Sequence, residues 1–233
     1  MNITDLNKKI HQLSLIDSLK AISEEFPGKI VFTTSFGIED QVITDMIFSN
    51  NIDIKIVSLD TGRLFEQTYK VFNATRDKYN KEIEIFYPKT EDVQKLLSTK
   101  GPYSFYNSIE NRKECCNIRK VEPLRRALEG HKCWITGIRS EQSTGRTEME
   151  MLEEDHGYGL LKVNPIYDWS LEDVMAYLKE KNVPYNSLHD QGFISIGCAP
   201  CTRAIKAGDD FRAGRWWWED NSGKECGLHT HGK

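Results

Sequence analysis

The sequence predicts an α/β fold with a doubly wound, mostly parallel sheet. Two observations favour it: short β-branched runs alternate with helical patterns, and Gly- or Ser-containing loops follow several of these runs. Such alternation is typical of parallel strands joined by helical crossovers. The predicted strands are 29–34, 53–59, 82–87, 132–136 and 160–166. We expect residues 1–205 to form the α/β domain, with residues 206–233 as a mobile C-terminal tail.

The helices follow from apolar residues spaced by three and four positions. The first is predicted over 4–25 and ends at Pro27-Gly28. Further helices are expected after residue 40 and over 64–79, 91–97, 112–128 and 171–181. Pro123 is a possible break in the fourth of these, and Ser170 is a good N-cap for the last. After Pro184 the periodicity is lost, which indicates a loop.

Polar motifs follow three of the predicted strands. They are Ser35-Phe-Gly-Ile-Glu-Asp40, with Gly37 and Glu39 inside it; Leu59-Asp60-Thr-Gly62-Arg63; and Gly137-Ile-Arg139. In open parallel sheets ligands bind at the carboxyl ends of the strands, so these motifs predict a ligand site. The first motif can bind an anion at a helix N-terminus, although it lacks the glycines of a Walker loop. An ordinary turn capped by Ser35 is the alternative.

The composition sets limits on the function. The 233 residues carry a formal net charge of −4, which gives no support for nonspecific nucleic-acid binding. The N-terminus has no apolar segment of signal-peptide length, and no run approaches a membrane span. We therefore expect a cytoplasmic protein with reduced thiols, in which six cysteines indicate a metal site or catalysis before disulfides.

Four of the cysteines form two close pairs, Cys115-Cys116 and Cys198-x-x-Cys201. Two such pairs can bind zinc, bind an iron–sulfur cluster or act as redox thiols. Adjacent helical cysteines suit a single zinc ion poorly, whereas each corner of a 4Fe–4S cube takes a separate thiolate. Lys120 lies one helical turn after Cys116, where it can offset the cluster's negative charge, face an anionic substrate, or simply be solvated.

The C-terminal segment combines cations, aromatic residues and a lone thiol. Arg212 and Arg215 precede three tryptophans, which we expect to dock the tail on the body of the protein. Cys226 lies between glycines with Lys224 and His229 nearby. Neighbouring cations lower a thiol's pKa and favour a nucleophile, although an unreactive tail cysteine fits the composition as well.

Taken together, these motifs resemble those of the assimilatory sulfonucleotide reductases. The match includes Lys113-Glu-Cys-Cys-x-x-Arg-Lys120, Thr136-Gly-Ile-Arg139, Gly197-Cys-x-x-Cys-Thr202, Arg212-Ala-Gly-Arg-Trp-Trp-Trp218 and Lys224-Glu-Cys-Gly-Leu-His229. In particular, the chain resembles the bacterial adenylylsulfate (APS) reductases that carry a 4Fe–4S cluster. The resemblance covers residues 29 to 229 and implies an adenine-nucleotide α-hydrolase-like fold.

The resemblance also implies roles for the site residues. Cys115, Cys116, Cys198 and Cys201 would bind the cluster, and Cys226 would attack APS, with Lys120 and His229 as further catalytic residues. The substrate would be bound by Ser35, Gly37, Glu39, Asp40, Leu59, Asp60, Gly62, Arg63, Gly137, Arg139, Arg212 and Arg215. The enzyme would form an S-sulfocysteine intermediate and AMP, and external thioredoxin would then release sulfite.

Several alternatives stay open at this point. The 3′-phosphorylated nucleotide (PAPS) can be the substrate, alone or together with APS. A tRNA thiolase of the pyrophosphatase type would show a loop richer in glycine than this one. A metal-stapled binding module without activity would bind zinc. A homo-oligomer is possible, and the sequence does not decide it.

Overall fold

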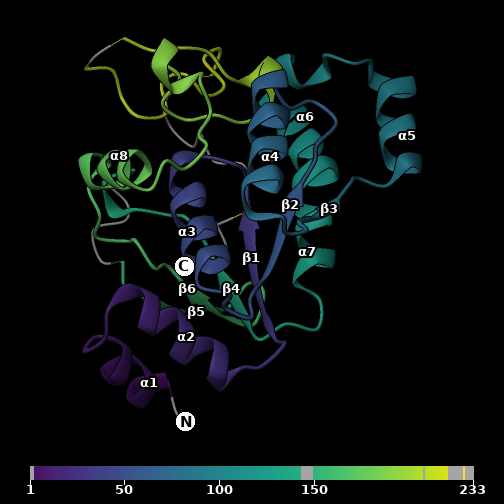
Figure 1. Cartoon of the computed structure of the whole chain (residues 1–233). Helices are drawn as coiled ribbons and strands as arrows, with labels where there is room; N and C mark the ends of the chain where they lie inside the picture. Colours follow the sequence, from purple (N-terminus) through teal and green to yellow (C-terminus); the bar gives the residue numbers. More distant parts are fainter. Residues whose placement is uncertain (1–2, 143–148, 207, 220–227, 229–233) are drawn as a thin grey trace.

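A six-stranded sheet forms the centre of the protein, in the order β3-β2-β1-β4-β6-β5 (Figure 1). The computed structural model describes residues 3–142, 149–206, 208–219 and 228. The strands are β1 (Ile30–Thr34), β2 (Lys55–Leu59), β3 (Glu84–Phe86), β4 (Cys133–Ile135), β5 (Leu152–Asp155) and β6 (Leu160–Val163). All neighbours pair in parallel except β5 and β6, which are antiparallel. The predicted mostly parallel α/β fold is confirmed, and β5 is an additional edge strand.

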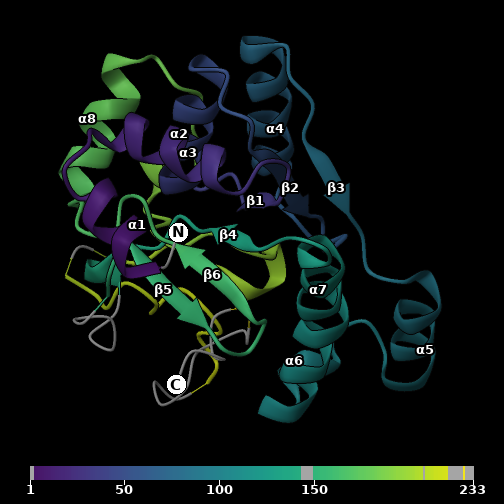
Figure 2. The ribbon, with the colours of Figure 1, turned by 90° about the horizontal axis from the view of Figure 1, so that it is seen from below.

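Helices cover both faces of the sheet. They are α1 (Ile3–Ile10), α2 (Leu15–Glu25), α3 (Ile38–Ser49), α4 (Glu66–Tyr79), α5 (Thr90–Lys100), α6 (Ile109–Cys116), α7 (Glu122–Leu128) and α8 (Leu171–Glu180). In Figure 2, α2, α3, α4 and α8 lie on one side of the sheet, and α6 and α7 lie on the other. The strands therefore end between two helical layers, which is where a doubly wound fold binds its ligands.

The prediction of a single helix over 4–25 is wrong, because the chain forms two helices there. Its break falls at residues 11–14, and Ser14 begins the second helix. The Ser14 side chain accepts a hydrogen bond from the backbone N–H of Asp17 at 3.2 Å. This N-cap satisfies a backbone donor at the new helix end, and Leu13, which lies in the break, is 40% exposed.

The predicted helix over 112–128 is continuous but changes its winding. A π-helical turn, Asn117–Val121, joins α6 to α7. The N–H of Glu122 reaches back five residues to the carbonyl of Asn117. Pro123, which has no N–H to donate, follows directly and is accommodated at the start of α7. The wide turn carries Arg119 and Lys120.

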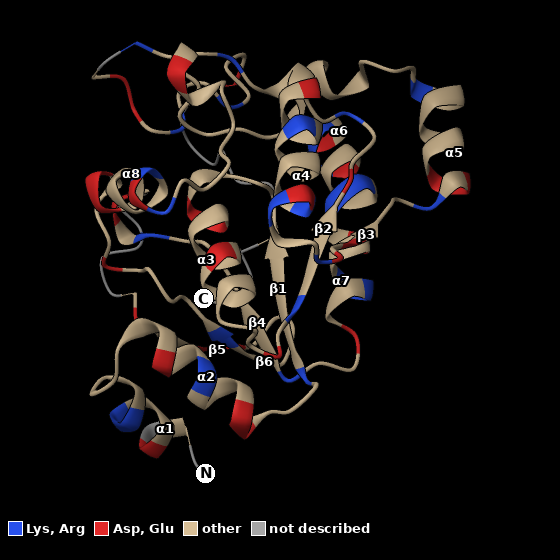
Figure 3. Ribbon diagram, in the orientation of Figure 1, with Lys and Arg blue, Asp and Glu red and all other residues tan. Residues whose placement is uncertain are grey.

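Both signs of charge are interspersed along the ribbon (Figure 3). The largest apolar cluster packs α1, α2, α3 and α8 against the sheet, with β1, β4 and β6 at its centre. A second, smaller cluster surrounds Cys115, Cys116, Cys198 and Cys201 at the end of α6. Across the described part of the chain, the helices are too short or too polar to span a bilayer.

Candidate active site

A cavity of about 250 Å³ opens at the carboxyl ends of β1, β2 and β4. The three strand-end motifs meet there, together with the π-helical turn and the C-terminal segment. Of the residues predicted to bind substrate, the lining includes Ser35, Gly37, Glu39, Asp40, Leu59, Gly137, Arg212 and Arg215, together with Lys120. Carboxylates and three cations thus line one cavity.

Asp40 organises the turn that leads from β1 into α3. Its Oδ2 accepts hydrogen bonds from the Ser35 N–H at 2.6 Å and from the Ser35 hydroxyl at 2.7 Å. The N-cap of α3 is Gly37, not Ser35, so Asp40 supplies the acceptor for this turn. Burial raises the pKa of Asp40 to about 6, although the bonds from Ser35 oppose the shift. Gly137 lies so close that a Cβ there would overlap the Asp40 carboxylate.

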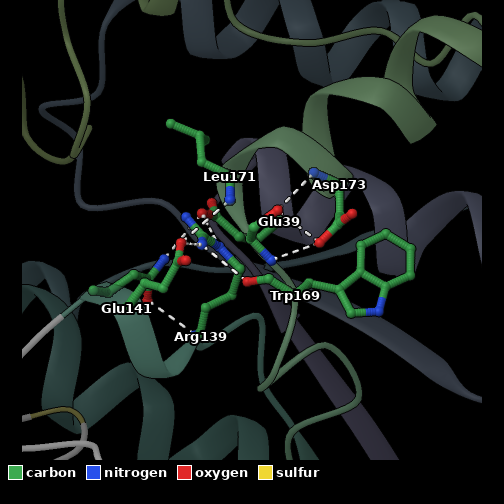
Figure 4. A network of polar contacts seen from close by, with 8 residues as sticks. Glu39, Arg139, Glu141, Trp169, Leu171 and Asp173 are labelled. Atoms are coloured by element: carbon green, nitrogen blue, oxygen red, sulfur yellow. Dashed lines mark hydrogen bonds and ion pairs between the residues drawn. The ribbon is translucent and has the colours of Figure 1, made fainter.

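Arg139 lies in an ion-pair network with Glu39 and Glu141 (Figure 4). It is not among the residues that line the cavity. Its Nε donates to Glu39 at 3.0 Å, and its Nη1 donates to Glu141 at 2.8 Å and to the Trp169 carbonyl at 3.1 Å. The side chain is 2% exposed. Gln142 also donates to Glu39, at 3.0 Å. The network orients Glu39, whose carboxylate does line the cavity.

The loop after β2 contributes residues to two places, the larger cavity and the region around the paired cysteines. Asp60 accepts hydrogen bonds from the Gly62 N–H at 2.7 Å and from the Tyr69 hydroxyl, which close the turn. Gly62 has φ +69°, a conformation that glycine adopts without strain. Arg63 extends to the cysteine side, where its guanidinium lies 5.1 Å from the Phe105 ring centre. Leu59 and Thr61 of this motif line the larger cavity, whereas Asp60, Gly62 and Arg63, which were also predicted to bind substrate, do not.

The four paired cysteines line a second, smaller cavity behind the first. All four are buried free thiols, as is Cys133 in β4. Cys198 donates a hydrogen bond to the Thr61 hydroxyl at 3.3 Å. Burial would raise the pKa of Cys198, but Lys120, Thr61 and Arg215 together bring it below the ordinary value. Lys120 lines both cavities and is thus a cation that the two share.

The surroundings of the cysteines fit an anionic iron–sulfur cluster. Thiolates are the ligands that such clusters take, and Leu96, Phe105 and Trp216 pack around them as an apolar shell. Within the described part of the chain, the Nε of Arg119 and the Nε1 atoms of Trp216 and Trp218 are buried without a hydrogen-bond partner. Buried N–H groups need acceptors, and cluster sulfurs would supply them. Within the described residues, no three His, Cys, Asp or Glu side chains form a site for a single metal ion.

His189 is a cavity residue that the sequence did not indicate. It lies in the short 3₁₀ turn His189–Gln191 and lines the cavity with Glu39. Its Nε2 is buried and has no hydrogen-bond partner among the residues that the structure describes, and burial lowers the pKa of the imidazole. A neutral imidazole here can donate one hydrogen bond to a ligand or accept one from it. The signal was missing because this segment has no periodicity and no recognised motif.

The C-terminal segment returns to the cavity. Cys226 and His229, predicted to be catalytic, lie outside the described residues. Leu228, two positions after Cys226, lines the cavity and packs on the apolar cluster that includes Val31 and Val57. The chain near the predicted nucleophile therefore reaches the cavity at Leu228.

A family model for the phosphoadenosine phosphosulfate reductase domain matches residues 29–204. The chain belongs to this family. A protein named adenosine 5′-phosphosulfate reductase from Sinorhizobium fredii (strain USDA 257) is 46% identical over 97% of this chain and 89% of its own length. One of the same name from Neisseria meningitidis (serogroup A, strain Z2491) is 52% identical over 85% of this chain and 82% of its own.

Two solved structures have a similar fold, and one of them is also related in sequence. A phosphoadenylyl-sulfate reductase from Candida auris, in a phosphate complex, is 30% identical with a TM-score of 0.74 and covers 87% of this chain and 96% of its own. An FMN adenylyltransferase from Candida glabrata is 15% identical over 97% of this chain and 85% of its own, with a TM-score of 0.54. The second likeness extends to the fold alone.

Proposed function

We propose that the chain reduces adenosine 5′-phosphosulfate to sulfite and AMP. The observation that supports this proposal most directly is the arrangement of charged side chains around the larger cavity. Lys120, Arg212 and Arg215 lie on its lining with Glu39 and Asp40, beside the buried cysteines. A nucleotide has both an anionic group for the cations and ribose hydroxyls for a carboxylate. The names of the close relatives support the same substrate.

The substrate residues divide by position. We assign the phosphosulfate to Lys120, Arg212 and Arg215, and the nucleoside to the turns that carry Ser35, Gly37, Glu39, Leu59 and Gly137. Asp40, Asp60 and Gly62 would shape these turns. Arg139 and Arg63, which do not line the cavity, would act indirectly: Arg139 orients Glu39, and Arg63 faces the cysteines.

In the first chemical step, the thiolate of Cys226 attacks the sulfur of the substrate's sulfate group. An S–S bond forms, the bond between that sulfur and the bridging oxygen breaks, and AMP leaves with the electron pair. The cations of the cavity would stabilise the charge on the leaving phosphate. His229 and Lys224 are the tail's candidates for holding Cys226 as the thiolate.

In the second step, a dithiol protein of the thioredoxin type supplies two electrons. One of its thiolates attacks the Cys226 sulfur and displaces sulfite, and its second thiol releases Cys226 as its own disulfide forms. We infer that Cys115, Cys116, Cys198 and Cys201 would hold a 4Fe–4S cluster. When bound, this group would supply a fixed, negatively charged centre beside the substrate cavity, and Lys120 would offset part of its charge.

The test is release of sulfite and AMP from APS with thioredoxin, thioredoxin reductase and NADPH supplied. We expect turnover by the unmodified chain and none by Cys226→Ser. Cys133→Ala is the matched control, because Cys133 is a buried thiol whose pKa is raised to about 12 by burial, and it should remain active. Turnover by Cys226→Ser would contradict the mechanism.

The same assay with PAPS tests the second candidate substrate. The likeness to the Candida auris PAPS reductase favours it. The two carboxylates on the cavity lining, Glu39 and Asp40, argue against a further phosphate near the ribose because like charges repel. We expect a higher kcat/KM for APS; the reverse order would make PAPS the substrate.

A further inference from the structure

The three tryptophans of the C-terminal segment do not form one patch. Trp216 is 1% exposed, whereas Trp217 and Trp218 are only partly buried. The backbone of Trp216 has φ +41°, in the left-handed region that a bulky residue adopts only when its surroundings enforce it. Its N–H donates to the carbonyl of Cys201 at 3.2 Å. The position of this one ring is therefore specified by the fold.

Three guanidinium groups surround the Trp216 ring. The Cζ atoms of Arg112, Arg215 and Arg212 lie 4.5, 4.8 and 5.5 Å from its centre. The negative face of an indole attracts cations at such distances, more strongly where water is excluded. Like charges gathered this closely would repel one another, so the ring provides part of what holds them together.

The three arginines have different surroundings. Arg112 lines the cysteine cavity and pairs with Glu219 through two hydrogen bonds, at 2.8 and 2.9 Å. Arg212 and Arg215 line the substrate cavity. Arg215 also packs flat on Gly197, where a Cβ would overlap its guanidinium. The ring thus lies between the charged lining of one cavity and that of the other.

Trp216 also packs against the cysteines. It belongs to the buried cluster formed with Cys115, Cys116, Cys198 and Cys201. An isolated β-bridge pairs Thr202 with Arg215, so the residue that follows Cys201 lies directly beside the arginine. The ring thus contacts the cysteines as well as Arg212 and Arg215.

We propose that Trp216 is a positioning residue that holds Arg212 and Arg215 toward the substrate's anionic group. The proposal rests on the proposed function, in which these arginines bind the phosphosulfate. Trp216 does not contact the substrate. Its ring fixes the direction in which the two guanidinium groups point. Because the ring packs on the cysteines, that direction depends on where the cysteines lie.

The test compares binding of two unreactive probes, ADP and adenosine, to the cluster-loaded protein. ADP carries a second phosphate where APS carries sulfate, and adenosine has no anion. We expect Trp216→Leu to raise the Kd for ADP about tenfold or more, with the Kd for adenosine unchanged within about twofold. Trp216→Phe keeps an aromatic face and should retain most of the ADP affinity.

Trp217→Leu is the matched control, because its ring faces Arg203, which does not line the cavity. It should bind ADP as the unmodified chain does. Thermal unfolding and iron content check that each variant is folded and loaded. If Trp216→Leu does not fold, Trp216→Met, which retains length without a π face, is read in the same way.

Two results would overturn the proposal: unchanged ADP affinity in the variant, or equal weakening of ADP and adenosine, which would mean general loosening of the cavity. Failure of the proposed function is a different result, namely no APS turnover by the unmodified chain. The two failures are therefore distinguishable.

Discussion

Asp40→Asn should make the protein more stable at neutral pH. Asp40 is buried, and burial raises its pKa from 3.8 to about 6. A carboxyl whose pKa is raised by folding stabilises the native state when protonated, and that contribution is lost as pH rises from about 4 through 6. Two pKa units correspond to about 3 kcal/mol in the free energy of unfolding. Asparagine cannot ionise, and its Oδ1 can still accept a bond from Ser35.

The gain is reduced because a carboxylate is the better acceptor for the Ser35 N–H and hydroxyl. We expect Asp40→Asn to be stabilised by about 1–2 kcal/mol at pH 8 and much less at pH 4, measured by urea denaturation.

Asp173→Asn is the matched control. Asp173 is also the third residue of its helix and bonds to a serine, Ser170, but it is exposed, and the bond from Ser170 lowers its pKa. Its substitution should cost stability as pH rises above about 4. An Asp40→Asn effect that is independent of pH, or largest in acid, would refute the reasoning.

Three other substitutions test the surroundings of the site. Gly197→Ala places a Cβ in the Arg215 guanidinium, and should weaken ADP binding about tenfold with little change in melting temperature; unchanged binding would count against a role for Arg215. Glu219→Gln removes the carboxylate that pairs with the buried Arg112 and should cost about 3 kcal/mol in the free energy of unfolding, measured with denaturant; a loss below about 1 kcal/mol would mean that water or another group compensates. Cys201→Ser should lower the iron and acid-labile sulfide content of purified protein, and full retention of both would remove Cys201 from the ligand set.

The strands and the strand-end motifs were predictable because their signals are local. β1 consists of β-branched and aromatic residues, and β2 and β4 contain Ile56-Val57 and Trp134-Ile135. Parallel strands place their following loops at one edge of the sheet. The grouping of the cysteines was predictable from residue type. β5 was missed because three of its four residues, Leu152–Asp155, are acidic, and its antiparallel pairing with β6 supplies what propensity does not.

Other features depend on contacts between distant residues. Arg139 was expected to bind the substrate, but its Nε donates a hydrogen bond to Glu39, a hundred positions away in the sequence. No local pattern indicates which of two nearby anions an arginine will contact. The separation of Trp216 from its neighbours, and the presence of His189 in the cavity, likewise arise only from the packing of the segment after α8.

The central claim is that Cys226 takes the sulfo group from APS before any reductant acts. The direct measurement is intact-protein and peptide mass spectrometry of the cluster-loaded chain mixed with APS in the absence of thioredoxin, with AMP quantified in the same sample. The mechanism predicts one sulfo group on the peptide that contains Cys226, one AMP per modified chain, and release of sulfite when thioredoxin is added. Sulfite released without an adduct, or an adduct on any other cysteine, would contradict it.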